Sequence, residues 1–580
     1  MMAYKEAFGQ LESESEAMRV RIDPKIGINK LIVEAPQTYF SYVELANALN
    51  AKDARGRKVE PMKIKDGLGI EKARLPTYSQ SNVTMAANAI YSFIKNVDSD
   101  SNDREKFFAE KPVSIYYATE SNPDFSRPEA EIALGLVYSR LLEEDEKRYR
   151  PYVEALKNSG LQQNTFACAG AGLALSSALS EVYSNSSFGI GSSAIIISAD
   201  TAVYDSKRAP DAETTQGSAA TLMWITTEPE LVSVNYKGAY GRFNVPFPDF
   251  TKFGVDTPFV HGKFSEKGYV YAVAMALGDM ESKLSRQERK AFKANYADED
   301  YDGGTYRGRK LNKLLDGDEF REKMKFFISH VPFPKQAIYF ASFLFEHYLK
   351  NYEQNAFEAM QQRESLGASP LGDKSLAELF TEKLAGFRGV HDADIVPYIE
   401  SDKEINAYWE WLGKLRKQPE FEEFLDRMHI RDALALPSQV GNSYTGSTVV
   451  AIASLLKSGK VYPGDTGACA FFGSGMVALA YQMEITATQE SVARNLIIGI
   501  DRKGELPLEA QNYEPLHEKL ILGDARRSMI GEEKSLIDMD AELLRGKLPE
   551  GFLIRRRNVN GTWEAEFVEN GRRNVLRPRL

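Results

Sequence analysis

The sequence predicts an α/β fold built from two similar halves. Residues 161–183 (LQQNTFACAGAGLALSSALSEVY) open with small residues and continue with apolar residues at helical spacing, which predicts a buried helix beginning just after Cys168. The β-branched run at 193–200 (SAIIISAD) predicts a buried strand. The same order of small residues, buried helix and buried strand returns at 439–457 and 468–472, roughly 275 residues later, and this favours an internal duplication.

Composition and charge exclude several classes of protein. The chain has 580 residues, 43% of them hydrophobic, and a formal net charge of −10. It can therefore form a sizeable core, but an acidic chain is a poor candidate for general nucleic-acid binding. No apolar run is long enough for a membrane helix, and the first twenty residues carry charges of both signs without an apolar stretch. We expect a soluble cytoplasmic protein with no membrane or nucleic-acid partner.

Cysteine and histidine are scarce. Cys168 and Cys469 could form at most one disulfide, and the six histidines form no close-spaced ligand pair, so a thiolate zinc site is nearly excluded. Each cysteine is thus either a small core residue or a reactive thiol. We interpret Cys469, which lies in a predicted buried strand, as packing.

Two interpretations of Cys168 stand side by side. At the start of a buried helix the thiol would sit at the positive end of the helix dipole, which lowers the thiol pKa and favours a reactive thiolate. Gly170 and Gly172 would leave room for a substrate or another backbone to approach. The alternative is a tightly packed helix start with an inert, buried thiol.

Two further polar residues follow predicted strands. His330 comes at the end of an apolar stretch (324–328), and Pro332 and Pro334 then stop regular structure. Glu120 follows the strand predicted within 113–119. Both positions suit a catalytic site, although His330 could be a capping histidine and Glu120 a solvated glutamate.

Taken together, these segments resemble the 3-hydroxy-3-methylglutaryl-CoA synthase family, a branch of the thiolase-like condensing enzymes. The matching pieces, in the order that the family has them, are ATESNPDFS, NTFACAGAG, SADTAVYD, TTQGSAATLMW, TPFVHGKFS, FFISHVPFPK, GNSYTGS and FFGSG, spanning residues 113 to 480. The resemblance implies a thiolase-like α/β fold, with two pseudo-duplicated halves in a layered αβαβα arrangement and a small C-terminal antiparallel β extension. It implies a thiolase-like half over 1–235, a second half over 236–485 with charged helical insertions, and an extension over 486–580.

The resemblance also implies roles for individual residues. Glu120 matches the acid/base, Cys168 the nucleophile that carries the acetyl group, and His330 the histidine that engages the acetoacetyl thioester. Positions that match substrate or CoA contacts are Thr215, Ser265, Lys335, Asn442 and Ser474. The implied reaction condenses acetyl-CoA with acetoacetyl-CoA through an acetyl-cysteine, with no metal or redox cofactor. A soft nucleophile and a carboxylate base suit that chemistry, but the sequence leaves open whether Glu120 or His330 protonates the ketone oxygen.

The chain departs from the family at two positions. Ala169 stands where the family usually has a tyrosine after the nucleophile, which would widen the pocket or require an aromatic ring from elsewhere. Tyr339 stands where a second lysine is often found, so CoA binding would draw positive charge from other residues.

Three regions lie outside the family motifs. Residues 280–322 and 350–425 are densely charged, and we interpret both as solvated helical excursions, the first with a turn at 302–304 and the second an insertion. Near the C-terminus, Asn560-Gly561 and Asn570-Gly571 predict hairpin turns joining three short antiparallel strands. This meander is basic, and we interpret its charge as protection of a sheet edge.

Two other functional classes compete with the implied reaction. A ketoacyl-carrier-protein synthase III-like enzyme or a polyketide β-branching synthase would act on carrier-protein substrates. A non-catalytic scaffold would retain the fold alone, but the joint presence of Glu120, Cys168 and His330 argues against it. From the resemblance we also expect a homodimer and a complex with acetoacetyl-CoA thiolase.

Overall fold

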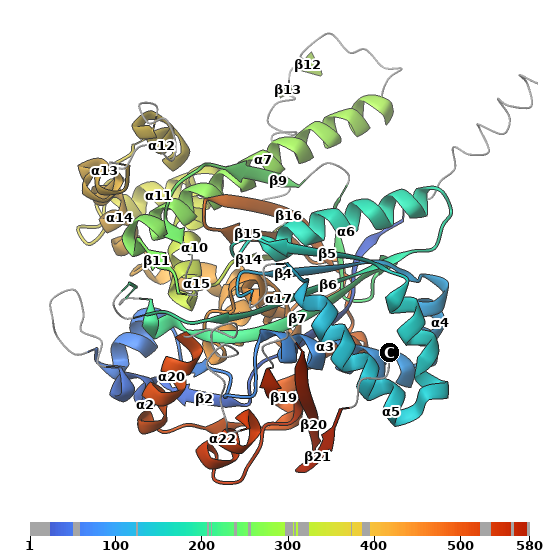
Figure 1. Cartoon of the computed structure of the whole chain (residues 1–580). Helices are drawn as coiled ribbons and strands as arrows, with labels where there is room; N and C mark the ends of the chain where they lie inside the picture. Colours follow the sequence, from blue (N-terminus) through green and yellow to red (C-terminus); the bar gives the residue numbers. More distant parts are fainter. Residues whose placement is uncertain are drawn as a thin grey trace, which may run out of the picture.

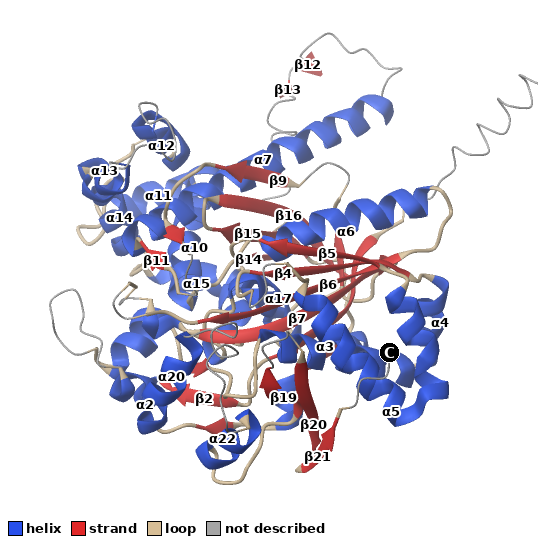
Figure 2. Cartoon of the chain, viewed as in Figure 1, coloured by secondary structure: helices blue, strands red, loops and turns tan. Residues whose placement is uncertain are grey.

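One large mixed sheet runs through the molecule, and helices pack against it (Figure 1, Figure 2). The computed structural model describes residues 24–49, 59–122, 126–205, 208–209, 212–236, 240–252, 257–295, 305–306, 309–310, 324–372, 374–384, 395–521, 535–557 and 562–576. Within these ranges the strand order is β14-β15-β16-β8-β1-β7-β6-β4-β5. The bounds are β1 (Ile26–Glu34), β4 (Pro112–Thr119), β5 (Gly160–Thr165), β6 (Ser193–Ala202), β7 (Gly217–Thr227), β8 (Val232–Val234), β14 (Phe326–Ser329), β15 (Thr466–Gly473) and β16 (Val477–Ile485).

The sheet repeats one pairing pattern, as the predicted duplication requires. β4 pairs in parallel with β6, which pairs antiparallel with β7. Likewise β14 pairs in parallel with β15, which pairs antiparallel with β16. Glu120 directly follows β4 and His330 directly follows β14, so the two residues occupy equivalent places in the two halves.

Helices form layers against these strands, as the predicted layered α/β architecture requires. α6 (Gly170–Ser187) packs on β4 and β6 of one half and also on β15 of the other, while α17 (Ser447–Lys457) packs on β14, β15 and β1. Both lie between the halves, and α17 is buried from Ser447 to Leu456 because its sequence is apolar on every face. Outside them, α3 (Asn82–Ser99), α4 (Ser101–Ala109) and α5 (Glu129–Lys157) cover one side.

The other side carries α7 (Gly262–Asn295) and α10 (Pro334–Tyr352) and the predicted insertion. The insertion is helical as expected: α11 (Gln354–Gln361), α12 (Leu376–Leu384), α13 (Ile395–Ser401), α14 (Lys403–Leu415), α15 (Pro419–Arg427) and α16 (Ile430–Leu434). The interpretation as a solvated excursion is wrong, however, because Tyr408, Trp411 and Phe424 are buried in the main core. In these helices the apolar residues that face the core are interspersed with charged residues along the sequence. The overall charge of the segment therefore does not reveal the apolar face.

Residues 280–322 are only partly described. α7 extends through 280–295, and two short strands, β12 (Thr305–Tyr306) and β13 (Arg309–Lys310), pair with each other. The turn expected at 302–304 lies outside the described residues. No helix in the described ranges is both long and apolar enough to cross a membrane.

The predicted C-terminal meander is present as β19 (Gly551–Arg557), β20 (Trp563–Glu569) and β21 (Arg572–Val575), paired antiparallel in that order. Asn570 and Gly571 have φ of 50° and 74°, the left-handed geometry that the predicted turn needs. The other Asn-Gly pair, 560–561, lies outside the described residues. β19 packs on α3, where the amide of Phe552 donates to Asn88 Oδ1 at 3.0 Å.

The segment before the meander is interwoven with the N-terminal residues. β17 (Leu496–Ile498) pairs in parallel with β1, and β18 (Leu506–Pro507) pairs with β2 (Thr38–Ser41), which also pairs with β3 (Lys72–Arg74). The remaining helices here are α2 (Tyr42–Ala48), α18 (Gln489–Asn495), α19 (Gly499–Lys503), α20 (Tyr513–Ile521) and α22 (Leu536–Leu543). The buried carboxylate of Asp540 accepts hydrogen bonds from Thr77 Oγ1 (2.7 Å) and from the amide of Tyr78 (2.8 Å), which fixes α22 to the chain leading into α3.

Candidate active site

Most of the predicted site residues line one cavity between the two halves. The cavity has a volume of about 420 Å³. The predicted residues on its wall are Cys168, Thr215, Ser265, His330, Asn442 and Ser474. Glu120 lies directly behind Cys168, whose thiol donates to Glu120 Oε2 at 3.8 Å. The residues come from segments spread over more than half the chain, and the fold brings them to one place.

Cys168 sits in the turn that joins β5 to α6. The amide of Gly170 donates to Ala167 O at 2.9 Å, which closes this turn and starts the helix. The chain of the other half comes very close: a Cβ added to Gly473 would lie 2.5 Å from the amide nitrogen of Ala169. Glycine at 473 is therefore required for the FFGSG segment to pack against the nucleophile turn.

The carboxylate of Asp200 holds the main chain at Glu120 in place. One oxygen of Asp200, on β6, accepts from the Glu120 amide (2.8 Å) and from Thr119 Oγ1 (2.9 Å). The other oxygen accepts from the amide of Thr445 (3.1 Å), which belongs to the opposite half. Asp200 thus fixes the position of Glu120 relative to both halves.

The electrostatics of Glu120 suit a proton acceptor near neutral pH. Burial, with smaller contributions from Asp200 and Asp249, raises the pKa of Glu120 to about 8, although the Lys252 ammonium opposes the shift. Its Oε1 atom is buried and has no hydrogen-bond partner among the residues described. A carboxylate in such surroundings exchanges a proton readily at physiological pH.

Of the two interpretations of Cys168, the structure contradicts the thiolate activated by a helix dipole. The dipole would lower the thiol pKa, but burial and then the negative charges of Glu120 and Asp200 raise the pKa well above the usual value. The thiol is 7% exposed and faces a carboxylate, so a dipole at the helix start does not outweigh desolvation. The resting site therefore holds a neutral thiol beside its proton acceptor rather than a thiolate.

His330 is a neutral imidazole in the cavity wall. Its amide donates to Ala470 O at 2.9 Å, which continues the β14–β15 pairing by one residue. Nδ1 is hydrogen-bonded to Ser447 Oγ, whose oxygen also accepts from the Val331 amide at 3.3 Å. Because Ser447 Oγ can accept from the ring as well as donate to it, this contact engages Nδ1 whichever ring nitrogen carries the proton. Burial lowers the pKa of His330 to about 3, so the ring stays uncharged.

The four predicted contact residues in the wall are fixed by other protein groups. Ser265 Oγ donates to Asp249 Oδ2 (3.0 Å), and the Ser474 side chain also bonds Asp249. Asn442 Nδ2 donates to Tyr204 OH at 2.9 Å, and Thr215 Oγ1 donates to Ala212 O at 2.7 Å. These side chains set the shape of the cavity. Lys335 is not among the lining residues, so its role stays a prediction.

The sequence analysis missed several groups of the site. Asp200 could have been found as an acidic residue within a buried strand. Asp249 accepts hydrogen bonds from the Gly475 amide at 3.0 Å and from Ser265 and Ser474. It precedes the two-residue strand β10 (Phe250–Thr251), and its sequence neighbours carry no comparable signal. Lys252 follows that strand. Lys63 and Lys263 are exposed cations that line the cavity, and they come from elements that the sequence did not link to the site.

Three aromatic rings from other segments pack around Cys168. They belong to Tyr204, Tyr444 and Phe250, and the rings of Tyr204 and Phe250 each lie 6.0 Å from that of Tyr444. Ala169 itself is fully buried against Gly473. The effect of Ala169 on the pocket stays a prediction.

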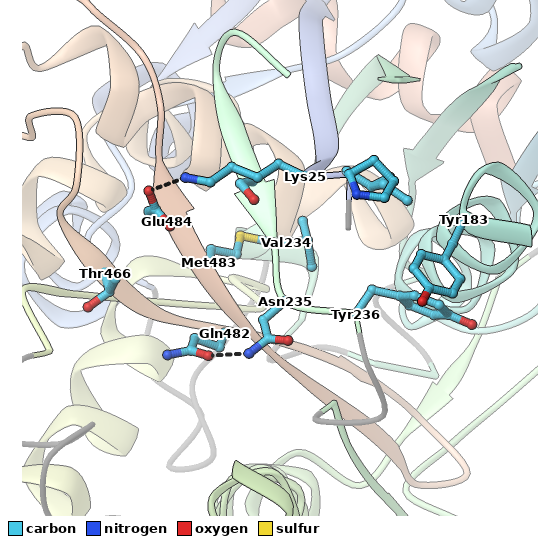
Figure 3. A pocket seen from close by; sticks show the side chains of 12 residues that line it. Lys25, Tyr183, Val234, Asn235, Tyr236, Thr466, Gln482, Met483 and Glu484 are labelled. Carbon is cyan, nitrogen blue, oxygen red and sulfur yellow. Dashed lines mark hydrogen bonds and ion pairs between the residues drawn. The ribbon is translucent and has the colours of Figure 1, made fainter. Parts of the chain in front are cut away.

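A second cavity, of about 400 Å³, lies at another part of the sheet (Figure 3). It holds an ion pair between Lys25 and Glu484 (2.9 Å) and an amide pair between Asn235 and Gln482 (2.7 Å). Its lining contains no cysteine, histidine or buried carboxylate. Across the part of the chain that the structure describes, no group of three or more metal-ligating side chains is found. The expectation that no cofactor is needed stays a prediction.

Comparison with known proteins agrees with this site. No protein-family model matches the chain. The hydroxymethylglutaryl-CoA synthase of Haloferax volcanii is 23% identical over 499 residues, covering 85% of this chain and 90% of that protein. The chain is thus similar over most of its length to a hydroxymethylglutaryl-CoA synthase. A second such synthase, from Enterococcus faecalis, is 24% identical over 249 residues, which are 43% of this chain and 54% of that protein.

Solved structures of hydroxymethylglutaryl-CoA synthases share the fold. MvaS in complex with 3-hydroxy-3-methylglutaryl coenzyme A superimposes with a TM-score of 0.57 at 19% identity, covering 94% of this chain and all of that one. PksG, a synthase from Bacillus subtilis, gives a TM-score of 0.58 at 14% identity with the same coverage. These likenesses confirm the thiolase-like fold that the sequence predicted.

Proposed function

We propose that the chain condenses acetyl-CoA with acetoacetyl-CoA to give 3-hydroxy-3-methylglutaryl-CoA and free CoA, the step that feeds mevalonate synthesis. The observation that carries the proposal is the contact between the Cys168 thiol and Glu120, a carboxyl whose pKa is raised to about 8, in a cavity shared with neutral His330. The similarity to the Haloferax volcanii synthase supports it, and so does the likeness in fold to MvaS, which was solved in complex with 3-hydroxy-3-methylglutaryl coenzyme A.

In the first step the sulfur of Cys168 attacks the acetyl carbonyl of acetyl-CoA. Because the thiol is neutral in the resting site, its proton passes to ionised Glu120 as the new carbon–sulfur bond forms. The bond to the CoA sulfur breaks, and CoA leaves as the thiol after taking up that proton. Glu120 is ionised again, and the acetyl group is held on Cys168.

In the second step Glu120 removes a proton from the methyl of acetyl-Cys168. The enolate attacks the ketone carbon of acetoacetyl-CoA, and the resulting alkoxide takes the proton back from Glu120. A pKa of about 8 lets one carboxyl serve as base and then as acid near neutral pH. Water finally cleaves the bond to Cys168, releasing the product as a free carboxylic acid and restoring the thiol.

His330 is assigned a hydrogen-bonding role rather than proton transfer. With a pKa lowered to about 3 the ring is neutral at neutral pH, and a neutral imidazole is a poor acid. Nδ1 is engaged by Ser447, so we assign the ring proton to Nε2, which would donate a hydrogen bond to a substrate oxygen in the cavity. Between the two proton donors that the sequence left open, these observations favour Glu120.

The cavity mouth offers cations for the CoA phosphates. Lys63, on the short helix η1 (Lys63–Leu68), and Lys263, at the start of α7, are exposed and line the cavity, whereas Tyr339 replaces a lysine of the family. Lys63 and Lys263 are therefore proposed as phosphate contacts beside the predicted Lys335. Ammonium groups bind phosphate as point charges, so exposed and movable lysines suffice.

The proposal is tested by incubating the full chain with acetyl-CoA and acetoacetyl-CoA and detecting 3-hydroxy-3-methylglutaryl-CoA by mass spectrometry. We expect product with these thioesters, and a Lys63→Ala/Lys263→Ala double variant should raise KM for both. Parallel reactions with acetyl- and acetoacetyl-carrier protein separate the alternative function. Turnover with carrier-protein thioesters alone would overturn the proposal, and so would no product with either.

The proposal extends to a homodimer joined through β5. This strand ends the described sheet path, and most of its residues are exposed, including Leu161 at 38%. An open edge can be continued by the same strand of a second copy. The cytoplasmic location and the complex with acetoacetyl-CoA thiolase stay predictions from the sequence.

Sedimentation analysis checks the dimer. The expected mass is twice 65.0 kDa, or 130 kDa. Leu161→Lys, which places a charge on the edge, should shift the mass towards that of one chain. Tyr462→Lys is the matched control, because Tyr462 is an exposed aromatic residue, 61% accessible, away from β5. A single chain in the unsubstituted protein would contradict the dimer.

A further inference from the structure

Lys252 is a charged residue at the reaction centre to which the sequence motifs assign no role. It follows β10, and its Nζ donates to the backbone carbonyl of Glu120 at 2.9 Å. The same ammonium lies 4.9 Å from the centre of the Tyr444 ring, on the cavity wall. Lys252 thus touches the main chain of the base and an aromatic ring that packs around the nucleophile.

Several of the described groups near this ammonium are acidic. Its charge acts on Glu120 at the end of β4, on Asp200 in β6 and on the Cys168 thiol at the start of α6. Asp249, which precedes β10, acts in turn on Glu120. Asp200 and Asp249 disfavour a further negative charge at Glu120. The Lys252 charge acts in the opposite direction on both Glu120 and Cys168.

The proposed chemistry needs such a cation. In the proton transfers that precede condensation, one negative charge is held by Glu120, by the sulfur of Cys168, or by the enolate formed on it, while Asp200 stays buried close by. Moving that charge among buried sites is costly unless a fixed opposite charge lies beside all of them. The contact with the Glu120 carbonyl and the Tyr444 ring keeps Lys252 in that position.

We propose that Lys252 is a positioning residue whose ammonium fixes the Glu120 main chain and serves as the counter-charge of the Glu120–Cys168 pair. The role rests on the function proposed above, since it matters to catalysis only if this pair performs it. Its effect on the thiol is nevertheless a property of the free protein, which can be measured without any thioester substrate.

A purely structural role would have a different signature. If Lys252 only holds the 250–252 segment against the cavity, its replacement lowers rates at every pH by the same factor. If it is the counter-charge, its removal raises the pKa of the coupled Glu120–Cys168 pair, so the pH dependence moves to higher pH. Lys252→Gln separates the two roles, because the amide can still donate to the Glu120 carbonyl but carries no charge.

The test follows alkylation of Cys168 by iodoacetamide across the pH range, with the Cys168 peptide quantified by mass spectrometry. Cys469 is fully buried and is resolved as a separate peptide. We expect Lys252→Gln and Lys252→Met to raise the pH midpoint of Cys168 alkylation by about one unit. At a given pH below the midpoint, alkylation should then be about tenfold slower. Lys252→Arg should keep the midpoint near that of the unsubstituted protein, and Lys25→Met, at the second cavity, should leave it unchanged (Figure 3).

The outcomes separate this inference from the proposed function. A midpoint in Lys252→Gln or Lys252→Met that coincides with the unsubstituted protein overturns the counter-charge, even if the variant is slower at every pH. An equal shift in Lys252→Arg overturns it as well. If the unsubstituted protein forms no acetyl-Cys168 with acetyl-CoA, the proposed function fails, yet the alkylation midpoints still decide the role of Lys252.

Discussion

Acetyl-CoA alone should leave an acetyl group on Cys168, seen by mass spectrometry of the intact chain as a gain of about 42 Da. The thiol lines the cavity and donates to Glu120, so the group that accepts its proton is already in contact. Peptide mapping should place the adduct on Cys168. Cys168→Ser should form no stable adduct and lose condensation by about a thousandfold or more, because a hydroxyl is a poorer nucleophile and leaving group.

Cys469 supplies the matched control. It is the other cysteine of the chain, and its side chain is fully buried in β15, away from any charge that would activate it. Cys469→Ala should therefore retain both the acetyl adduct and the turnover. An adduct on Cys469, or none in the unsubstituted protein, would contradict the assignment of the nucleophile.

Glu120→Gln should separate acetylation of Cys168 from the condensation that follows it. Glutamine keeps the size of the side chain but cannot accept a proton, so condensation should fall by about 10²–10⁴-fold. Acetylation of Cys168 should persist at a reduced rate, because other bases such as water can accept the thiol proton. The measurement is product formation from both thioesters, together with the yield of acetyl-enzyme from acetyl-CoA alone.

The pH dependence gives a second sign of the same group. Since ionised Glu120 removes the methyl proton and its pKa is raised to about 8, kcat/KM should rise with pH and reach half its maximum near that value. Glu120→Gln should lack this rise. Glu484→Gln, in the second cavity, is the control and should behave as the unsubstituted protein (Figure 3). A Glu120→Gln variant that condenses at the normal rate would remove Glu120 from the mechanism.

Local sequence patterns were enough for the framework of the fold, whereas the choice of Cys168, Glu120 and His330 as central residues came from the resemblance to a known family. Cys168, Glu120 and His330 each border a buried helix or strand that its own neighbours specify, so short stretches predict their placement. The paired halves and the C-terminal meander follow from similar local signals, namely apolar runs and an Asn-Gly turn.

What the sequence could not predict depends on residues far apart in the chain. The helix dipole at Cys168 is a local property, whereas Glu120 and Asp200, which help reverse its expected effect, come from two other strands. The ammonium of Lys252 and the carboxylate of Asp249 meet the site only through tertiary packing. The insertion was misread for a related reason, since charged residues dominate its composition while Trp411 and Tyr408 enter the core.

The pairing of β17 with β1 bears on how the chain is made. Leu31 lies opposite Leu496, so one edge of a central strand is completed by residues more than 460 positions later. Until these residues leave the ribosome, the backbone of β1 at Leu31–Val33 lacks this partner, and the amino-terminal half cannot finish its sheet. Contacts this distant in sequence slow folding and leave strand edges exposed meanwhile. We expect the nascent chain to depend on chaperones until its C-terminal segment is complete.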